Sequence, residues 1–135
     1  LMYEEHQHVL AKVIQRLKIL GVSIDGATEH TYEKLRLGGR WHKINSNLIA
    51  IQRSKIAHGF VFRLHMVVQE DNWRELRHMA ELGEKYGADE IYFSKIQDWN
   101  TGMDHSKQTF ADLPEFKNLR AEVETMSSNH IFGGF

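Results

Sequence analysis

The fold is decided by the stretch Gly59-Phe60-Val61-Phe62-Arg63-Leu64-His65-Met66-Val67-Val68. Every second residue from Phe60 onward is apolar, whereas the positions between them mix valine with Arg63 and His65. Successive side chains of a β-strand point to opposite faces of the sheet, so this alternation is typical of a strand. The stretch therefore predicts a strand over 59–68 with one apolar face that packs on helices.

Strands and helices alternate along the rest of the chain. Further strands are predicted over 18–25 and 90–96. Apolar residues recur at helical spacing in the segments 3–16, 28–35, 41–54, 73–86 and 114–126. Strands that alternate with helices in this way indicate βαβ units and a parallel sheet.

Residues at the helix ends support these boundaries. Thr28 is expected to cap the helix over 28–35, and Gly87 to end the helix that begins after Asn72. Asn72 with Glu75 three residues later predicts a variant of the capping box. Pro114 suits the first turn of the last helix, because its missing N–H costs nothing there.

The length sets the fold class. A complete eight-unit β/α barrel takes about 250 residues, and this chain has 135. We therefore predict an α/β fold in a single domain over 1–135: a partial (half) TIM-type β/α barrel of three to four parallel strands with flanking helices. Half a barrel has unpaired edge strands and an uncovered inner face.

The composition excludes several classes of protein. The formal charge is -1, without the excess of Lys and Arg that nucleic-acid binders usually show, so no nucleic-acid partner is expected. No apolar run reaches the 18 or so residues of a membrane span, and the N-terminus has no signal-peptide pattern. The sequence predicts a soluble, cytoplasmic protein without a membrane partner.

Metal chemistry has little support in the sequence. There is no cysteine, so disulfides, thiolate-held zinc and iron–sulfur ligation are excluded within these residues. The nine histidines include one close pair, His6 and His8, but a spacing of two residues points them apart on a helix. No H-E-x-x-H spacing occurs, so no metal site is predicted and a zinc hydrolase is the minor alternative.

One region resembles a known enzyme family. The motif Val22-Ser23-Ile24-Asp25-Gly26-Ala27-Thr28 is followed by Thr31-Tyr32-Glu33-Lys34-Leu35-Arg36 and by Gly38-Gly39. With the strand that ends in Val67-Val68 and with Asn72, these motifs resemble the radical S-adenosylmethionine enzyme core, in the branch with SPASM or twitch extensions. The resemblance covers most of 21–99. It implies the C-terminal half of a barrel that reductively cleaves S-adenosylmethionine with a [4Fe–4S] cluster.

The chain departs from that family in one decisive respect. The family holds its cluster with three cysteine thiolates, and this sequence has none. We therefore expect a fragment of a radical SAM enzyme that is inactive alone, with weak or absent binding of S-adenosylmethionine. The alternative is a stand-alone α/β module that binds or assembles without catalysis.

The resemblance also implies roles for individual residues. Ser23 and Asp25 lie at the carboxyl end of a predicted parallel strand, where barrel active sites are built. A residue at the place of Ser23 binds the ribose of the cofactor in similar proteins, and an arginine near Arg36 binds its carboxylate. In the structural alternative, Asp25 caps the following turn and Arg36 is a solvated helix end. We favour cofactor binding for Ser23 and Arg36, and the structural role for Asp25.

Arg63 and His65 interrupt the second face of the strand over 59–68. If the apolar face packs on helices, these two side chains point into the barrel, toward the substrate cavity. The alternative is a structural ion pair with Asp25 or Glu90. Because the open edges and inner face need covering, we also expect a homodimer formed through the barrel edges or the inner face.

Overall fold

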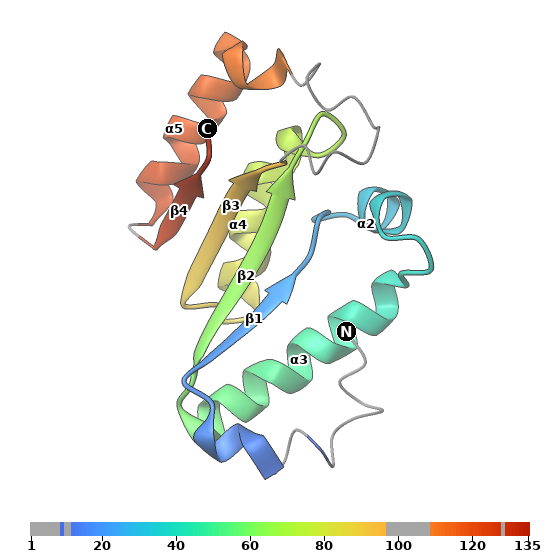
Figure 1. Cartoon of the computed structure of the whole chain (residues 1–135), viewed down its shortest axis with the longest axis vertical. Coiled ribbons are helices and arrows are strands. Elements are labelled where there is room, and N and C mark those ends of the chain that lie inside the picture. The colour runs from blue at the N-terminus through green and yellow to red at the C-terminus, as the bar shows by residue number, and fades with distance from the viewer. Residues whose placement is uncertain (1–8, 10–11, 97–108, 128) are drawn as a thin grey trace.

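The computed structural model describes residues 9, 12–96, 109–127 and 129–135. Figure 1 shows a sheet with helices packed against it. The elements, in chain order, are η1 (Ile14–Arg16), β1 (Ile19–Ser23), α2 (Glu29–Leu35), α3 (Trp41–His58), β2 (Val61–Val68), η2 (Trp73–Glu75), α4 (Leu76–Lys85), β3 (Glu90–Lys95), η4 (Thr109–Asp112), α5 (Pro114–Met126) and β4 (His130–Gly133). The three η elements are short 3-10 helices.

The four strands form one sheet in the order β1-β2-β3-β4, and every neighbouring pair is parallel. This confirms the prediction of an α/β fold with three to four parallel strands. The sequence analysis leaves β4 unassigned, because four residues that end in glycine show no period of their own. Its pairing with β3, from Ile91 opposite His130 to Ser94 opposite Gly133, defines it as a strand.

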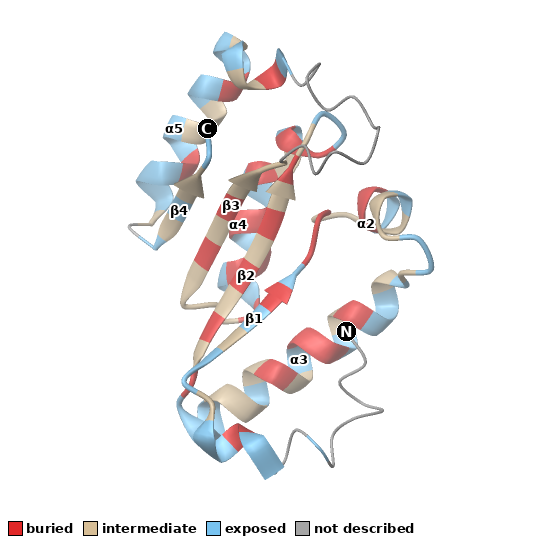
Figure 2. Cartoon of the chain, viewed as in Figure 1, coloured by how far each residue is buried: buried red, intermediate tan, exposed pale blue. Residues whose placement is uncertain are grey.

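The predicted two faces of β2 are confirmed. Alternate residues from Phe60 to Val68 are at most 2% exposed, and the residues between them are half-buried. Figure 2 shows these alternating bands along β2 and β3. The buried face packs on α3, α4 and α5 through one apolar cluster, which includes Ile44, Leu48, Ile51, Phe62, Leu64, Met66, Leu76, Met79, Phe93, Phe116 and Val123.

The helix ends follow local chemistry closely. The Oγ1 atom of Thr28 accepts a hydrogen bond from the Thr31 N–H, as predicted. Gly87, just after α4, has a φ of 68° and so adopts the left-handed conformation that suits glycine. The helix α3 runs to His58, four residues beyond the predicted end, and ends at Gly59 with a φ of 73°. Its last turn is exposed, so apolar spacing does not mark it.

The predicted capping box at Asn72 is wrong. The Asn72 side chain makes no cap hydrogen bond, and η2 separates it from α4. The reason is that both side chains bond elsewhere: Asn72 to Asp25, Val67 and Gln69, and Glu75 to the loop before α2. Of the predicted first helix, 3–8 and 10–11 lie outside the described residues.

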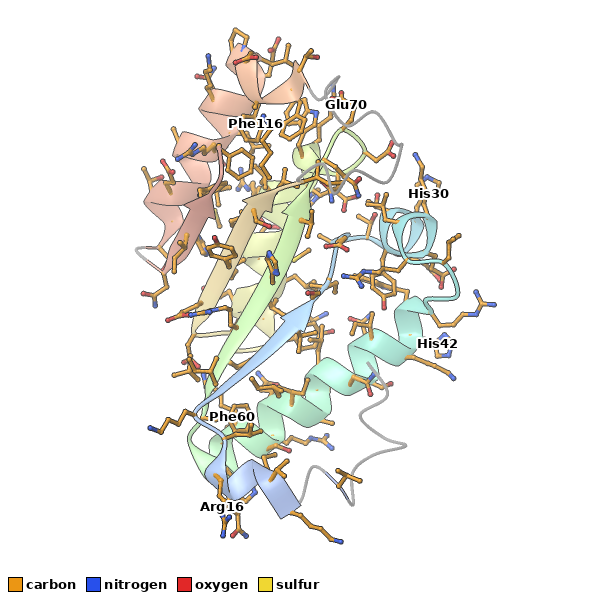
Figure 3. All side chains as sticks on the ribbon, viewed as in Figure 1. Arg16, His30, His42, Phe60, Glu70 and Phe116 are labelled. Atoms are coloured by element: carbon orange, nitrogen blue, oxygen red, sulfur yellow. The ribbon has the colours of Figure 1, made fainter. Side chains whose placement is uncertain are left out.

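All strands end on the same side of the sheet, and α2 lies at that carboxyl end (Figure 1). Figure 3 shows His30 and Glu70 at this end, and Arg16 and Phe60 at the opposite one. Within the described ranges, no helix combines the length and apolar character that crossing a membrane requires.

Candidate functional site

The face of the sheet opposite the helices carries three of the predicted site residues, Ser23, Arg63 and His65. The strand register places Ser23 beside His65, and His65 beside Tyr92. Two positions nearer the amino ends, Arg63 lies beside Glu90. We call this surface the inner face, since it corresponds to the inside of a barrel.

An ion pair forms at the carboxyl end of β1. The Nη2 atom of Arg36 lies 2.7 Å from Oδ2 of Asp25. The other oxygen of Asp25 accepts a hydrogen bond of 3.0 Å from the Val67 N–H, and the residue is only 9% exposed. Asp25 therefore makes structural contacts, but they run to β2 and to Arg36 and not to the following turn that it was expected to cap. Arg36 is held in place by Asp25 and is not a freely solvated helix end.

Arg36 keeps unused hydrogen-bonding capacity. Its Nε atom is buried and has no hydrogen-bond partner among the described residues, whereas the side chain as a whole is 40% exposed. A guanidinium group has five N–H donors in a planar fork and is suited to a carboxylate. Ser23, the last residue of β1, is exposed on the same end of the sheet.

The loop between β1 and α2 is tied to the loop after β2 by Asn72, which is 1% exposed. Its amide nitrogen donates to the backbone oxygens of Asp25, at 2.9 Å, and Val67, at 2.8 Å. Its amide oxygen accepts from the Gln69 N–H at 2.8 Å. This one side chain therefore fixes the backbone at Asp25, the acidic partner of the Asp25–Arg36 pair.

Glu75 adds a second tie to the same loop. Its carboxylate accepts three hydrogen bonds: from the Ala27 N–H at 2.7 Å, from the Thr28 hydroxyl at 2.7 Å and from the Thr31 hydroxyl at 2.6 Å. We call Asn72 and Glu75 the loop clamp. Their spacing in the sequence predicts a local cap, because spacing alone cannot reveal partners more than 40 positions away.

Close backbone contact also requires glycine in this loop. A Cβ atom at Gly26 would lie 2.4 Å from the backbone nitrogen of Tyr32. The loop clamp and this close approach together hold the start of α2 against the end of β1. Burial raises the pKa of Tyr32, with smaller and mixed contributions from Arg36, Asp25 and Glu33.

The structure pairs Arg63 with Glu90, one of the two partners that the sequence suggested as an alternative to a substrate role. The Nε atom of Arg63 lies 2.7 Å from Oε2 of Glu90. Both side chains are about one third exposed, at 38% and 31%. The pair places opposite charges side by side on the inner face and leaves no net charge there.

His65 bonds to a serine rather than to a carboxylate. Its Nε2 atom and the Ser94 Oγ atom share a hydrogen bond of 2.7 Å, and its ring lies 5.2 Å from that of Tyr92. Burial lowers the pKa of His65; Asp25 opposes this shift, and the charges of Arg36 and Arg63 reinforce it. His65 is therefore a neutral hydrogen-bonding group near pH 7.

Tyr92 is an inner-face residue that was not predicted from the sequence. Its position alternates with the buried Ile91 and Phe93, so the period of the strand over 90–96 was a signal that could have identified it. Gly133 in β4 makes room for the tyrosine: a Cβ atom there would lie 2.2 Å from the hydroxyl oxygen.

The residues do not fit an iron–sulfur cluster, since the sequence has no cysteine to supply thiolates. The described ranges also contain no cluster of three or more His, Asp or Glu side chains placed to hold a metal ion. His6 and His8, the close histidine pair of the sequence, lie outside the described residues.

A separate cavity of about 250 Å³ lies at the amino ends of β3 and β4, lined in part by Asp89, Ile91 and His130. The carboxylate of Asp89 has a structural role. Burial would raise the pKa of Asp89, but hydrogen bonds from Lys55 and the Phe62 N–H, and the charge of Lys55, lower it overall. In β/α barrels this end serves stability, so the carboxyl end remains the candidate site.

Comparisons with known proteins place the fold. No protein-family model matches the chain, and no curated protein matches it. Among solved structures, it is similar to SuiB from Streptococcus suis, in a crystal structure with S-adenosylmethionine bound. The TM-score is 0.63 at 12% sequence identity, over 91% of this chain and 28% of that chain. The match confirms the partial-barrel fold. The chain therefore spans just over a quarter of the length of this structural neighbour.

Proposed function

We propose that this chain supplies the S-adenosylmethionine half-site of a radical SAM-type barrel, from the branch with SPASM or twitch extensions. In this proposal Arg36 binds the carboxylate of the ligand and Ser23 binds its ribose. Asp25 orients the guanidinium group. The observation that carries the proposal is the Asp25–Arg36 pair at the carboxyl end of β1, within a fold shared with a protein solved with S-adenosylmethionine bound.

The chemistry of Arg36 supports this assignment. Asp25 occupies one end of the guanidinium fork, and the buried Nε atom lacks an acceptor among the described residues. A ligand carboxylate would bind the exposed part of the guanidinium group, since the side chain as a whole is 40% exposed. The inner face favours a ligand with polar groups, because its side chains can form hydrogen bonds without presenting a net charge. His65 is a neutral hydrogen-bonding group, and the charges of Arg63 and Glu90 cancel.

Cleavage of the sulfonium of S-adenosylmethionine needs more than the binding residues of this chain. Reductive cleavage in the family that this chain resembles needs a [4Fe–4S] cluster, whose thiolates would have to come from outside these 135 residues. We therefore expect binding without cleavage. Without a cluster to anchor the ligand, the dissociation constant is expected in the millimolar range, roughly -4 kcal/mol.

A titration of the ¹⁵N-labelled chain with S-adenosylhomocysteine, followed by NMR, tests the binding site. Amide signals from the β1–α2 loop are expected to shift and to approach saturation in the millimolar range. Arg36→Ala is expected to weaken binding at least tenfold. Arg53→Ala, which removes an exposed arginine of α3, is the matched control and is expected to bind like the wild type. Equal binding by Arg36→Ala and the wild type would exclude the proposed site.

Anaerobic reconstitution with iron and sulfide tests the second half of the proposal. We expect no iron to remain bound after desalting and no 5′-deoxyadenosine from added S-adenosylmethionine with a reductant. A stoichiometric cluster, detected by its visible absorbance and iron content, would contradict the proposed division between ligand binding and catalysis.

A further inference from the structure

The sheet is open at both edges within the described part of the chain. Each edge strand, β1 and β4, has one strand neighbour there. Unpaired backbone N–H and C=O groups at such edges favour pairing with another strand. The helices α3, α4 and α5 pack on the other face of the sheet, so they do not cover the inner face.

The strand count matches half of a closed barrel. Barrels of alternating β and α units close with eight parallel strands and carry their helices outside. This chain provides four parallel strands in sequential order. A two-fold axis through the middle of the barrel would place β4 of each copy beside β1 of the other. Two copies therefore close the sheet, with every new pairing parallel.

The side chains at the two edges suit this closure. Ile19 in β1 is 50% exposed and Ile131 in β4 is 40% exposed. Both lie on the inner face, since Ile19 is in register with Val61 and Ile131 with Tyr92. Closure would bring these two apolar side chains to the same junction and remove them from water, which is favourable.

The inner face is also compatible with a second copy of itself. Its charged pair, Arg63 and Glu90, sums to zero, so doubling the surface brings no excess of like charge together. Small residues lie beside large ones on this face: Gly21 is in register with Arg63, and Gly133 leaves room for Tyr92. Interiors of small barrels are often filled by such alternation of small and large side chains.

We propose that the chain forms a two-fold symmetric homodimer in which β4 of one copy pairs with β1 of the other, closing an eight-stranded barrel. The occupant of both edges is a second copy. This inference does not rest on S-adenosylmethionine binding: the dimer and the ligand site can each fail while the other holds.

Disulfide trapping tests the geometry, because the chain has no native cysteine to interfere. Three samples are oxidised: Ile19→Cys alone, Ile131→Cys alone, and an equal mixture of the two. We expect a covalent dimer in the mixture and little in either single sample. Strong cross-linking of a single variant would indicate pairing of β1 with β1 or of β4 with β4 and would overturn the proposal. No cross-linking in any sample would also count against it.

Light scattering tests the stoichiometry independently of the cysteine positions. We expect a molar mass of twice 15.8 kDa at low micromolar concentration. Ile131→Lys and Ile19→Lys are each expected to shift the mass to that of the monomer, with far-ultraviolet circular dichroism unchanged. Ile56→Lys, at a position of α3 that is 82% exposed, is the matched control and is expected to remain dimeric. A wild-type chain that stays monomeric on concentration would overturn the proposal.

Discussion

The two faces of the sheet have different roles: one packs on the helices and the other carries polar side chains. On the helix-covered face, β2 presents side chains that are at most 2% exposed. On the inner face, the same strand presents Arg63 and His65, which are half-buried and bonded to polar partners on β3. One strand thus stabilises the fold with one set of alternate residues, and its other set carries Arg63 and His65 between two valines. Substitutions on the two faces should therefore differ in kind.

The largest expected difference lies between two adjacent aromatic residues of β3. Phe93 is fully buried and stacks on Phe132, with ring centroids 4.6 Å apart. Tyr92 is half-buried on the inner face. In samples dilute enough to be monomeric, Phe93→Ala is expected to lower the free energy of unfolding by about 3–5 kcal/mol, and Tyr92→Ala by about 1 kcal/mol. Urea denaturation followed by tryptophan fluorescence measures both.

The same pair of variants also reports on what covers the inner face. If Tyr92→Ala were as destabilising as Phe93→Ala, Tyr92 would be packed in a dry interior. That outcome at protein concentrations where the chain is monomeric would contradict the open inner face. The same outcome restricted to dimeric samples would agree with the proposed closed barrel.

A smaller effect is expected from the loop clamp, which links the two faces at the carboxyl end. Glu75→Ala removes the acceptor for three hydrogen bonds and leaves the Ala27 N–H without its partner. The expected loss is about 1.5–3 kcal/mol. Glu75→Gln is expected to recover much of this loss, because its oxygen can accept from Ala27 and its amide can donate to a threonine hydroxyl.

Glu84→Ala provides the matched control for the loop clamp. Glu84 is an exposed residue of α4, the helix that follows Glu75 directly, so its removal is expected to change stability by less than about 0.5 kcal/mol. Thermal and urea unfolding of the three variants should therefore rank them with Glu75→Ala lowest. Equal stability of Glu75→Ala and Glu84→Ala would show that the loop does not depend on the clamp.

The contrast between faces also explains how far the sequence could predict this structure. The alternation from Phe60 to Val68 defined β2 and its buried face, because a period of two is a local property of a strand. The caps at Thr28 and Gly87 were likewise predictable, since each depends on residues within one turn. The tail strand β4 was not, because its definition depends on pairing with β3.

The candidate site was harder to predict for the same reason. Five residues could be named, but their partners could be assigned only in part. Arg63 pairs with Glu90, as one alternative held, whereas His65 bonds to Ser94 and Asp25 bonds to Arg36. Asn72 and Glu75 carry a local capping pattern but make long-range bonds, so only the folded structure distinguishes the two.

The smallest expected effect concerns the pH dependence of stability, and it comes from His65 on the inner face. Burial, reinforced by Arg36 and Arg63, lowers the pKa of His65 below its value in the unfolded chain, although Asp25 acts in the opposite direction. Near pH 7.5 the group is about neutral in both states and contributes no slope. As the pH falls through about 6.5, the unfolded chain binds a proton that the native state does not. The free energy of unfolding should therefore decrease until the pH passes below the native pKa.

His65→Gln, whose amide can still bond to Ser94, is expected to show a shallower decrease between about pH 7.5 and about pH 5. His42→Gln, which changes an exposed histidine of α3, is the control. Its free energy of unfolding is expected to decrease with falling pH as steeply as that of the wild type. Urea unfolding at a series of pH values measures these slopes. A wild-type curve that is parallel to that of His65→Gln would show that the inner face leaves this histidine as accessible to protons as it is in the unfolded chain.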